Sequence, residues 1–105
     1  MRIRKTFVMT INPGCEEEYR KRHDNLWPEM KEILKRHGVH NYSISLCAET
    51  NQLFAYVEID SEEEWNSIAN TKECQEWWHY MSDIMETNED SSPKSVELRE
   101  VFYMD

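Results

Sequence analysis

The stretch Val39–Ile59, VHNYSISLCAETNQLFAYVEI, contains two segments in which apolar and polar residues alternate. The apolar positions that share a face are Tyr42, Ile44 and Leu46 in the first segment and Leu53, Ala55, Val57 and Ile59 in the second. A period of two residues is typical of half-buried strands. Because only the short polar link 49–52 separates the segments, the stretch predicts a β-hairpin.

Upstream of this hairpin, the sequence predicts a strand and then a helix. Apolar residues alternate over Ile3–Ile11, which favours a strand. Asn12 and Pro13 suit the N-cap and the first helical position, and the helix should run to the basic turn before Gly38. Pro28 lies inside this region, so we expect a kink or break near Trp27.

Downstream, a second helical region and a last strand follow. Ser61 with Glu64 forms a capping-box sequence that opens the region, and Thr71 is placed to cap a second piece. The polar segment Asn88–Pro93 reads as a loop, and Val96–Tyr103 reads as the final strand.

The complete order is β-α-β-β-α-β, the ferredoxin-like pattern of the α+β class. We therefore expect residues 1–105 to form a single domain, with one antiparallel sheet and its helices on one face. The opposite face of the sheet would be open and mixed in polarity, and the sheet of a partner could cover it.

Composition limits the classes of partner. The formal net charge is −9, which argues against nucleic acids and anionic membranes and favours a neutral or cationic small molecule. No apolar run approaches the ~20 residues that span a bilayer, and the basic start lacks the apolar region of a signal peptide. Three widely spaced cysteines form no disulfide or metal pattern, so we expect a cytoplasmic protein.

Tyr19 and His23 lie one helical turn apart on the apolar stripe of the first helix. On pattern alone, a core histidine bonded to a backbone carbonyl is the more common outcome. If the first turn instead opens into a cavity, His23 is well suited to move protons near neutral pH.

Trp77 and Trp78 are adjacent in the second helical region, and their rings should point about 100° apart. They cannot both fill one hole in the core, so they can serve as flat walls for a ligand, although simple core packing is equally compatible with the spacing. Tyr42 points to the same side of the sheet as Ile44 and could be either a core residue or a third wall.

The sequence predicts no cofactor and no metal. It has only two glycines, Gly14 and Gly38, and no glycine-rich phosphate loop. The set His23, Cys74 and His79 matches no known spacing of metal ligands.

The chain resembles the L-rhamnose mutarotase family over essentially its whole length. The matching pieces are Phe7-Val8-Met9, Asn12-Pro13, Glu17-Glu18-Tyr19, Arg22-His23, Trp27-Pro28-Glu29, His37-Gly38, Asn41-Tyr42, Leu53-Phe54-Ala55, Ser61-Glu62-Glu63, Cys74-Gln75, Trp77-Trp78, Tyr80-Met81, Ser92-Pro93 and Glu100-Val101-Phe102-Tyr103. Each piece is unspecific alone, but together and in order they are highly specific.

The resemblance implies an isomerase that interconverts the α and β anomers of L-rhamnose without metal or cofactor, as a homodimer of the α/β-barrel type. It implies His23 as the proton donor, with Tyr19, Tyr42, Trp77 and Trp78 contacting the sugar. The second proton carrier stays open among Tyr19, a water and a sheet carboxylate such as Glu100. The alternatives are a cofactor-independent monooxygenase of the same dimeric fold and a sugar-binding dimer without catalysis.

Overall fold

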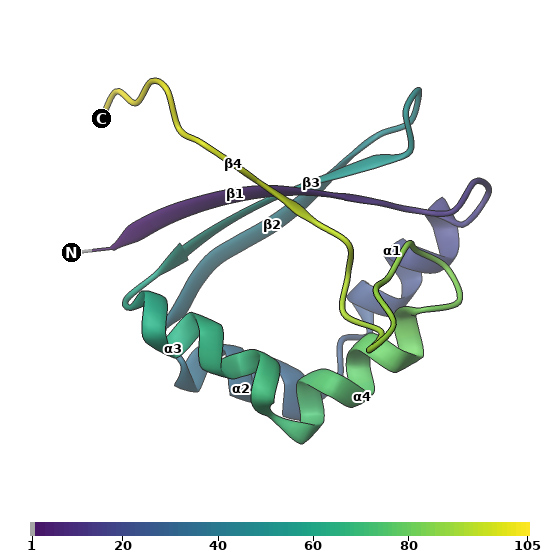
Figure 1. Cartoon of the computed structure of the whole chain (residues 1–105), viewed down its shortest axis with the longest axis horizontal. Helices are drawn as coiled ribbons and strands as arrows, with labels where there is room; N and C mark the ends of the chain where they lie inside the picture. The colour runs from purple at the N-terminus through teal and green to yellow at the C-terminus, as the bar shows by residue number, and fades with distance from the viewer. Residues whose placement is uncertain (1) are drawn as a thin grey trace.

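Four antiparallel strands form one layer of the molecule, in the order β2-β3-β1-β4 (Figure 1). The computed structural model describes residues 2–105. The strands are β1 (Ile3–Thr10), β2 (Val39–Cys47), β3 (Gln52–Ile59) and β4 (Val96–Leu98). β2 pairs with β3 as the predicted hairpin, and β1 pairs with β3 from Ile3↔Ile59 to Thr10↔Gln52.

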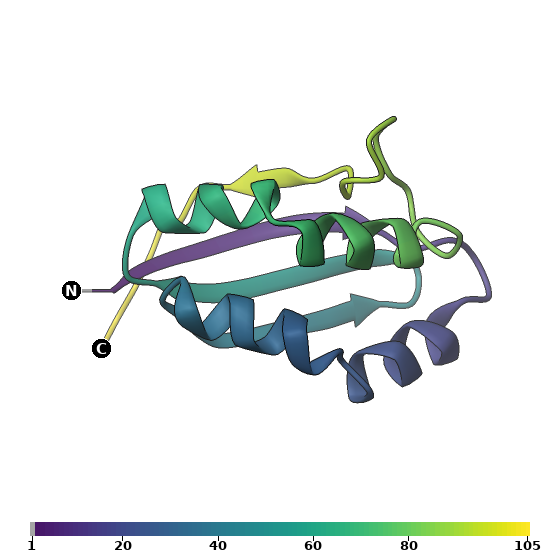
Figure 2. The same ribbon diagram turned by 90° about the horizontal axis from the view of Figure 1, so that it is seen from below.

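The helices all cover one face of this sheet (Figure 2). They are α1 (Glu16–Asp24), α2 (Pro28–Arg36), α3 (Glu62–Ser67), the 3-10 turn η1 (Ile68–Asn70) and α4 (Lys72–Met81). The α+β, ferredoxin-like arrangement expected from the element order is confirmed.

The first helical region divides where proline predicts it. Trp27 has extended backbone angles (φ −57°, ψ 133°), and Pro28 occupies the first turn of α2. The expected start of α1, however, is wrong. Gly14 makes a turn with φ of 82°, so the helix begins only at Glu16, and the side-chain amide of Asn12 donates instead to the carbonyl oxygen of Asp83, 3.3 Å away.

The second helical region follows its caps. The hydroxyl of Ser61 accepts from the backbone N–H of Glu64, and the hydroxyl of Thr71 accepts from that of Cys74, both at 3.2 Å. Because each hydroxyl satisfies an N–H that has no partner inside its helix, the region forms two helices joined by η1, as the sequence predicts.

The last strand is shorter than predicted. β4 pairs with β1 only from Thr6↔Leu98 to Val8↔Val96, and the chain then leaves the sheet. The guanidinium of Arg4 bonds both carboxylate oxygens of Glu100 at 3.0 and 2.9 Å and lies 3.5 Å from the ring centroid of Tyr103. These contacts tie the start of the tail to Arg4 of β1. Beyond β4 the chain continues as a tail without strand pairing (Figure 1), and the apolar side chains of this tail are among the most exposed in the chain.

The core lies between the sheet and the helices. Its most deeply buried members include Ile11, Leu53, Val57 and Ile59 from the strands and Cys74 from α4. The other face of the sheet carries Phe54, Val96 and Leu98, which are exposed. Among residues 2–105, no helix is long and apolar enough to cross a bilayer.

Gly38, between α2 and β2, generates a prediction for stability. Its φ is 78°, and a Cβ there would lie 2.7 Å from Oδ2 of Asp60. Gly14 has a similar φ of 82°, but nothing lies within 4 Å of its Cβ position. We expect Gly14→Ala to lower the free energy of unfolding by ~1–2 kcal/mol through backbone strain alone. Gly38→Ala should lower it further because Asp60 must move. Urea denaturation of both variants measures the difference, and equal losses would contradict the prediction.

Candidate active site

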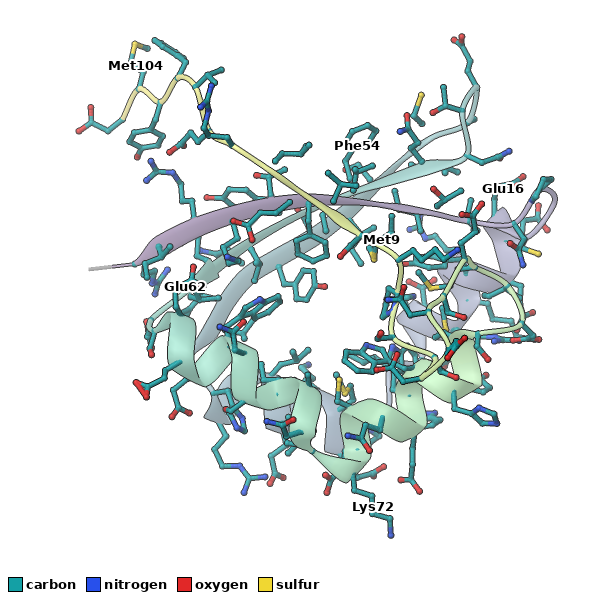
Figure 3. The ribbon with its side chains drawn as sticks, in the orientation of Figure 1. Met9, Glu16, Phe54, Glu62, Lys72 and Met104 are labelled. Carbon is teal, nitrogen blue, oxygen red and sulfur yellow. The ribbon has the colours of Figure 1, made fainter. Side chains whose placement is uncertain are left out.

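A cavity of about 1300 Å³ lies between the sheet and the helices. Side chains from both layers point into this hollow in Figure 3. The five residues singled out in the sequence all line it, and they come from α1, β2 and α4: Tyr19, His23, Tyr42, Trp77 and Trp78.

Helix α1 brings Tyr19 and His23 together because they are four residues apart. Their rings stack with centroids 4.3 Å apart, and Nδ1 of His23 lies 3.1 Å from the backbone oxygen of Tyr19. A carbonyl oxygen can only accept a hydrogen bond, so Nδ1 carries the proton when the ring is neutral. The Nε2 atom is then left with a free lone pair.

Burial keeps the imidazole of His23 neutral. Desolvation lowers its pKa from 6.5, and it outweighs the hydrogen bond to Tyr19, which acts in the opposite direction. His23 is therefore uncharged near neutral pH and can accept a proton at Nε2.

The two tyrosines remain protonated and can donate hydrogen bonds. Burial raises the pKa of both Tyr19 and Tyr42 above the usual value of 10, and the nearby Tyr42 raises that of Tyr19 further. Tyr42 lies in a β-bulge between His40 and Ser43, an irregularity that turns side chains locally. Although its hydroxyl is desolvated, 36% of Tyr42 is exposed, and the residue lines the cavity.

The adjacent tryptophans differ in burial. Trp77 is only 6% exposed and packs edge-on against His23 and Trp27, with ring centroids 5.5 and 5.1 Å apart. Trp78 is half-buried. Trp77 therefore belongs both to the core and to the cavity wall, whereas Trp78 forms a more open part of that wall.

Two aromatic residues that the sequence did not single out as site residues also line the cavity. Phe7 and Trp65 each lie close to Tyr42, with ring centroids 6.4 and 6.1 Å from it and 6.1 Å from each other. In the sequence, Phe7 belongs to the alternating apolar residues of Ile3–Ile11, and Trp65 lies four residues after the Ser61 cap. Neither position predicts that the side chain contacts Tyr42.

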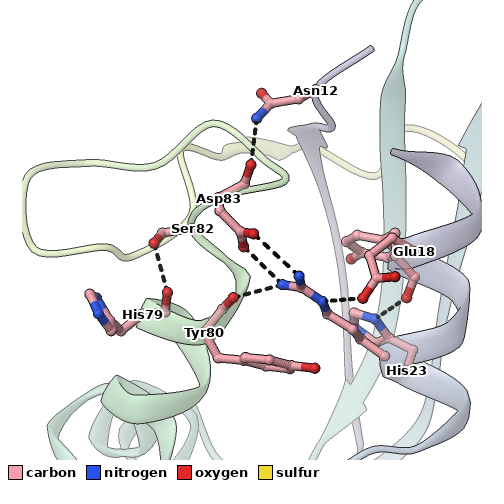
Figure 4. A network of polar contacts seen from close by, with 9 residues as sticks. Asn12, Glu18, His23, His79, Tyr80, Ser82 and Asp83 are labelled. Carbon is pink, nitrogen blue, oxygen red and sulfur yellow. Dashed lines mark hydrogen bonds and ion pairs between the residues drawn. The ribbon is translucent and has the colours of Figure 1, made fainter. Parts of the chain in front are cut away.

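Arg22 links α1 to the end of α4 by hydrogen bonds, and Figure 4 labels its partners Glu18, Tyr80 and Asp83. Its guanidinium donates to Glu18 at 2.8 Å, to the backbone oxygen of Tyr80 at 2.7 Å and to both oxygens of Asp83 at 2.9 and 3.3 Å. It also lies 4.3 Å from the ring centroid of Tyr80. Only 10% of the Arg22 side chain is exposed, so these contacts are shielded from solvent on the arginine side. The sequence pattern does not predict this role of Arg22.

Of the other candidate groups, Glu100 lies outside the cavity, and Cys74 lines it but stays protonated. Glu100 is held by Arg4 and is absent from the cavity lining. Burial raises the pKa of Cys74 to about 12, so its thiol stays protonated. Within residues 2–105, no three His, Cys, Asp or Glu side chains gather closely enough to hold a metal ion.

Comparison with known proteins adds independent findings. The family model described as L-rhamnose mutarotase matches residues 4–104. Proteins named L-rhamnose mutarotase from Tolumonas auensis and Shigella flexneri are each 58% identical over 102 residues, covering 97% of this chain and 98% of theirs. The one from Opitutus terrae is 57% identical over 103 residues, covering 98% and 99%.

Solved structures agree at the level of the fold and of the family. The crystal structure of an L-rhamnose mutarotase from Formosa agariphila superposes with a TM-score of 0.91 at 45% identity, covering 98% of this chain and 99% of that one. A putative antibiotic biosynthesis monooxygenase from Nitrosomonas europaea reaches 0.65 at 11% identity, covering 96% and 91%, which shows a shared fold alone. With the model match, the identities and the structure in agreement, this chain belongs to the L-rhamnose mutarotase family.

Proposed function

We propose that this chain interconverts the α and β anomers of L-rhamnose by opening and closing the sugar ring. Family membership gives the reaction, and one observation carries the mechanism: a neutral imidazole with a free Nε2 in an aromatic cavity. Among the described residues that line the cavity, His23 is the only histidine.

In the ring-opening step, Nε2 of His23 takes the proton of the anomeric hydroxyl, and the ring oxygen receives a proton from a second donor. The bond between C1 and the ring oxygen breaks, which gives an open aldehyde. After rotation about C1–C2, the C5 hydroxyl attacks the other face of C1 and returns its proton to the second donor, while the imidazolium returns its proton to the carbonyl oxygen. His23 thus acts as base in opening and as donor in closure, a role worth roughly 10²–10⁴-fold in rate.

The second proton comes from a group inside the cavity. Glu100, which the sequence left as a candidate second proton carrier, is excluded from this role because it pairs with Arg4 and does not line the cavity. The hydroxyl of Tyr19 and a bound water remain for this role. The raised pKa of Tyr19 keeps that hydroxyl protonated and able to donate a hydrogen bond to the ring oxygen throughout the neutral range, although it also makes the hydroxyl a weaker acid.

The aromatic walls suit a deoxy sugar. Trp77, Trp78 and Tyr42 offer flat apolar surfaces for the C–H face of the pyranose and its methyl group. The same walls limit the access of water to the open aldehyde. A neutral sugar also meets no repulsion from a protein of net charge −9.

A monooxygenase and a sugar-binding protein are the two other functions weighed from the sequence. Similarity to monooxygenases is confined to the fold, at 11–15% identity, whereas the mutarotase relatives reach 58%. Oxygen uptake with an aromatic substrate would favour the monooxygenase. Sugar binding without anomer exchange would favour the binding protein.

We further propose that the protein works as a homodimer in the cytoplasm. The open face of the sheet carries Phe54, Val96 and Leu98, and the tail beside it carries Val101 and Phe102, both more than three-quarters exposed. A second copy covering this face would remove that apolar surface from water. The three cysteines are unpaired, which fits a reducing compartment.

Saturation-transfer NMR on the anomeric protons of L-rhamnose tests the reaction. Micromolar protein should speed exchange, and His23→Gln should lower kcat by roughly 10²-fold or more while sugar binding persists. His79→Gln, an exposed histidine outside the cavity lining, serves as the control and should leave exchange unchanged. No acceleration by the unaltered protein would remove the proposal.

The lowered pKa of His23 predicts the pH profile. Because the neutral imidazole starts the cycle, activity falls when the ring becomes protonated, and the lowered pKa moves that loss to the acid side of 6.5. The acid limb of kcat/KM should therefore have its midpoint below pH 6.5, and tyrosine ionisation should not affect the neutral range. A midpoint above pH 6.5 would contradict the assigned environment.

Replacement of Arg22 should lower turnover, although this residue does not line the cavity. Arg22→Met removes the tie between α1 and Asp83, so His23 moves relative to the sugar, and kcat should fall by roughly tenfold or more. Arg36→Met removes an exposed pair with Glu32 on α2 and should change kcat by less than about twofold. If the two variants have the same kcat, Arg22 does not position the helix.

The apolar tail predicts the basis of dimerisation. Phe102→Glu would bury a charge at the proposed interface, so sedimentation velocity should show a shift from dimer to monomer. Arg99→Glu changes charge on the same segment without adding a polar group at an apolar position and should remain dimeric. A monomeric unaltered protein would refute the dimer.

A further inference from the structure

The cavity is larger than one monosaccharide requires. L-Rhamnose has eleven non-hydrogen atoms, and even at the ~30 Å³ that a water molecule occupies in the liquid it would need roughly 330 Å³. The cavity measures about 1300 Å³. The sugar bound beside His23 therefore leaves most of the space to another occupant.

The additional space has its own aromatic wall. Phe7 from β1, Tyr42 from β2 and Trp65 from α3 form a triangle in which each pair of ring centroids is 6.1–6.4 Å apart. Tyr42 connects this triangle to the site around His23, because it lines the same cavity as Tyr19 and His23. The second wall therefore adjoins the proposed rhamnose site.

The polar residues of the cavity lining on this side are uncharged, and the charged groups beside Phe7 lie outside the lining, where Lys5 pairs with Glu62 and Glu97. Apart from His23, the ionisable acidic and basic residues that line the cavity all belong to α1: Glu16, Glu17, Arg20, Lys21 and Asp24. Beyond α1, the polar lining includes Asn66, next to Trp65, and Ser92 and Ser95, in the segment leading into β4. Ser95 directly precedes Val96, which pairs with Val8, so it lies beside the strand that carries Phe7. Aromatic rings with amide and hydroxyl groups suit a neutral sugar.

We propose that Phe7, Tyr42 and Trp65 form a second subsite, which binds a neutral sugar unit attached to L-rhamnose. The enzyme would then interconvert the anomers of disaccharides that carry L-rhamnose at the reducing end. The inference rests on the proposed function. Ring opening involves only C1, its hydroxyl and the ring oxygen, so a substituent at another hydroxyl leaves the reacting atoms and the proton balance unchanged. The glycosidic bond itself is not broken.

The test compares two substrates in the same exchange measurement. L-Rhamnose and a glucosyl disaccharide linked through O3 or O4 of a reducing L-rhamnose are each followed by saturation transfer at the anomeric protons. The unaltered protein should accelerate exchange in both. Trp65→Ala should lower the ratio of kcat/KM for the disaccharide to that for L-rhamnose by roughly tenfold or more. His79→Ala removes an exposed ring outside the cavity lining and should leave the ratio unchanged.

A second variant keeps the test decisive if Trp65→Ala does not fold. Ser95→Trp adds bulk at an exposed position of the cavity lining and should reduce exchange of the disaccharide selectively. Exchange of L-rhamnose without exchange of the disaccharide by the unaltered protein would overturn the second subsite. Equal losses for both sugars in Trp65→Ala and Ser95→Trp would also overturn it. Absence of exchange with L-rhamnose would instead overturn the proposed function.

Discussion

The geometry of the site depends on the hydrogen bonds that the guanidinium of Arg22 donates to Tyr80 and Asp83. Helix α1 carries both Tyr19 and His23, yet Tyr19 is its one buried residue, so the hydrophobic effect alone holds it weakly. Arg22 adds directed bonds to the end of α4, which carries the tryptophans. The side-chain amide of Asn12, just after β1, donates to the backbone oxygen of Asp83 in the segment that follows α4. One charged side chain thus sets the spacing between the imidazole and the opposite wall.

The cavity itself follows from breaks in the helical layer. Pro28 divides the first helical region, and Thr71 caps a new helix after η1 in the second. Each region therefore bends, and the four helices arch over the sheet instead of lying flat on it (Figure 1). Large aromatic side chains line the space that this arch encloses, which keeps it open and apolar.

Local chemistry made much of this predictable. The alternation in Val39–Ile59, the caps at Ser61 and Thr71 and the break at Pro28 each depend on a few neighbouring residues, and the structure has all of them. The Asn12 cap was wrong because Gly14 adopts a positive φ that delays the start of the helix. The length of β4 was wrong because alternation in Val96–Tyr103 does not reveal where pairing with β1 ends. The stacking of Tyr19 on His23 follows from helical spacing. The contacts of Arg22 and Trp65 arise only from tertiary packing.

The bond from Nδ1 of His23 to the carbonyl of Tyr19 has one more consequence. It leaves the imidazole a single working nitrogen, so a proton must enter and leave through the same atom. A proton that the ring removes from one anomer is returned to the sugar before the next molecule binds. Over a full turnover the protein neither gains nor loses a proton, and the anomeric equilibrium stays where solution chemistry sets it. The protein therefore changes only the rate at which the anomeric equilibrium is reached.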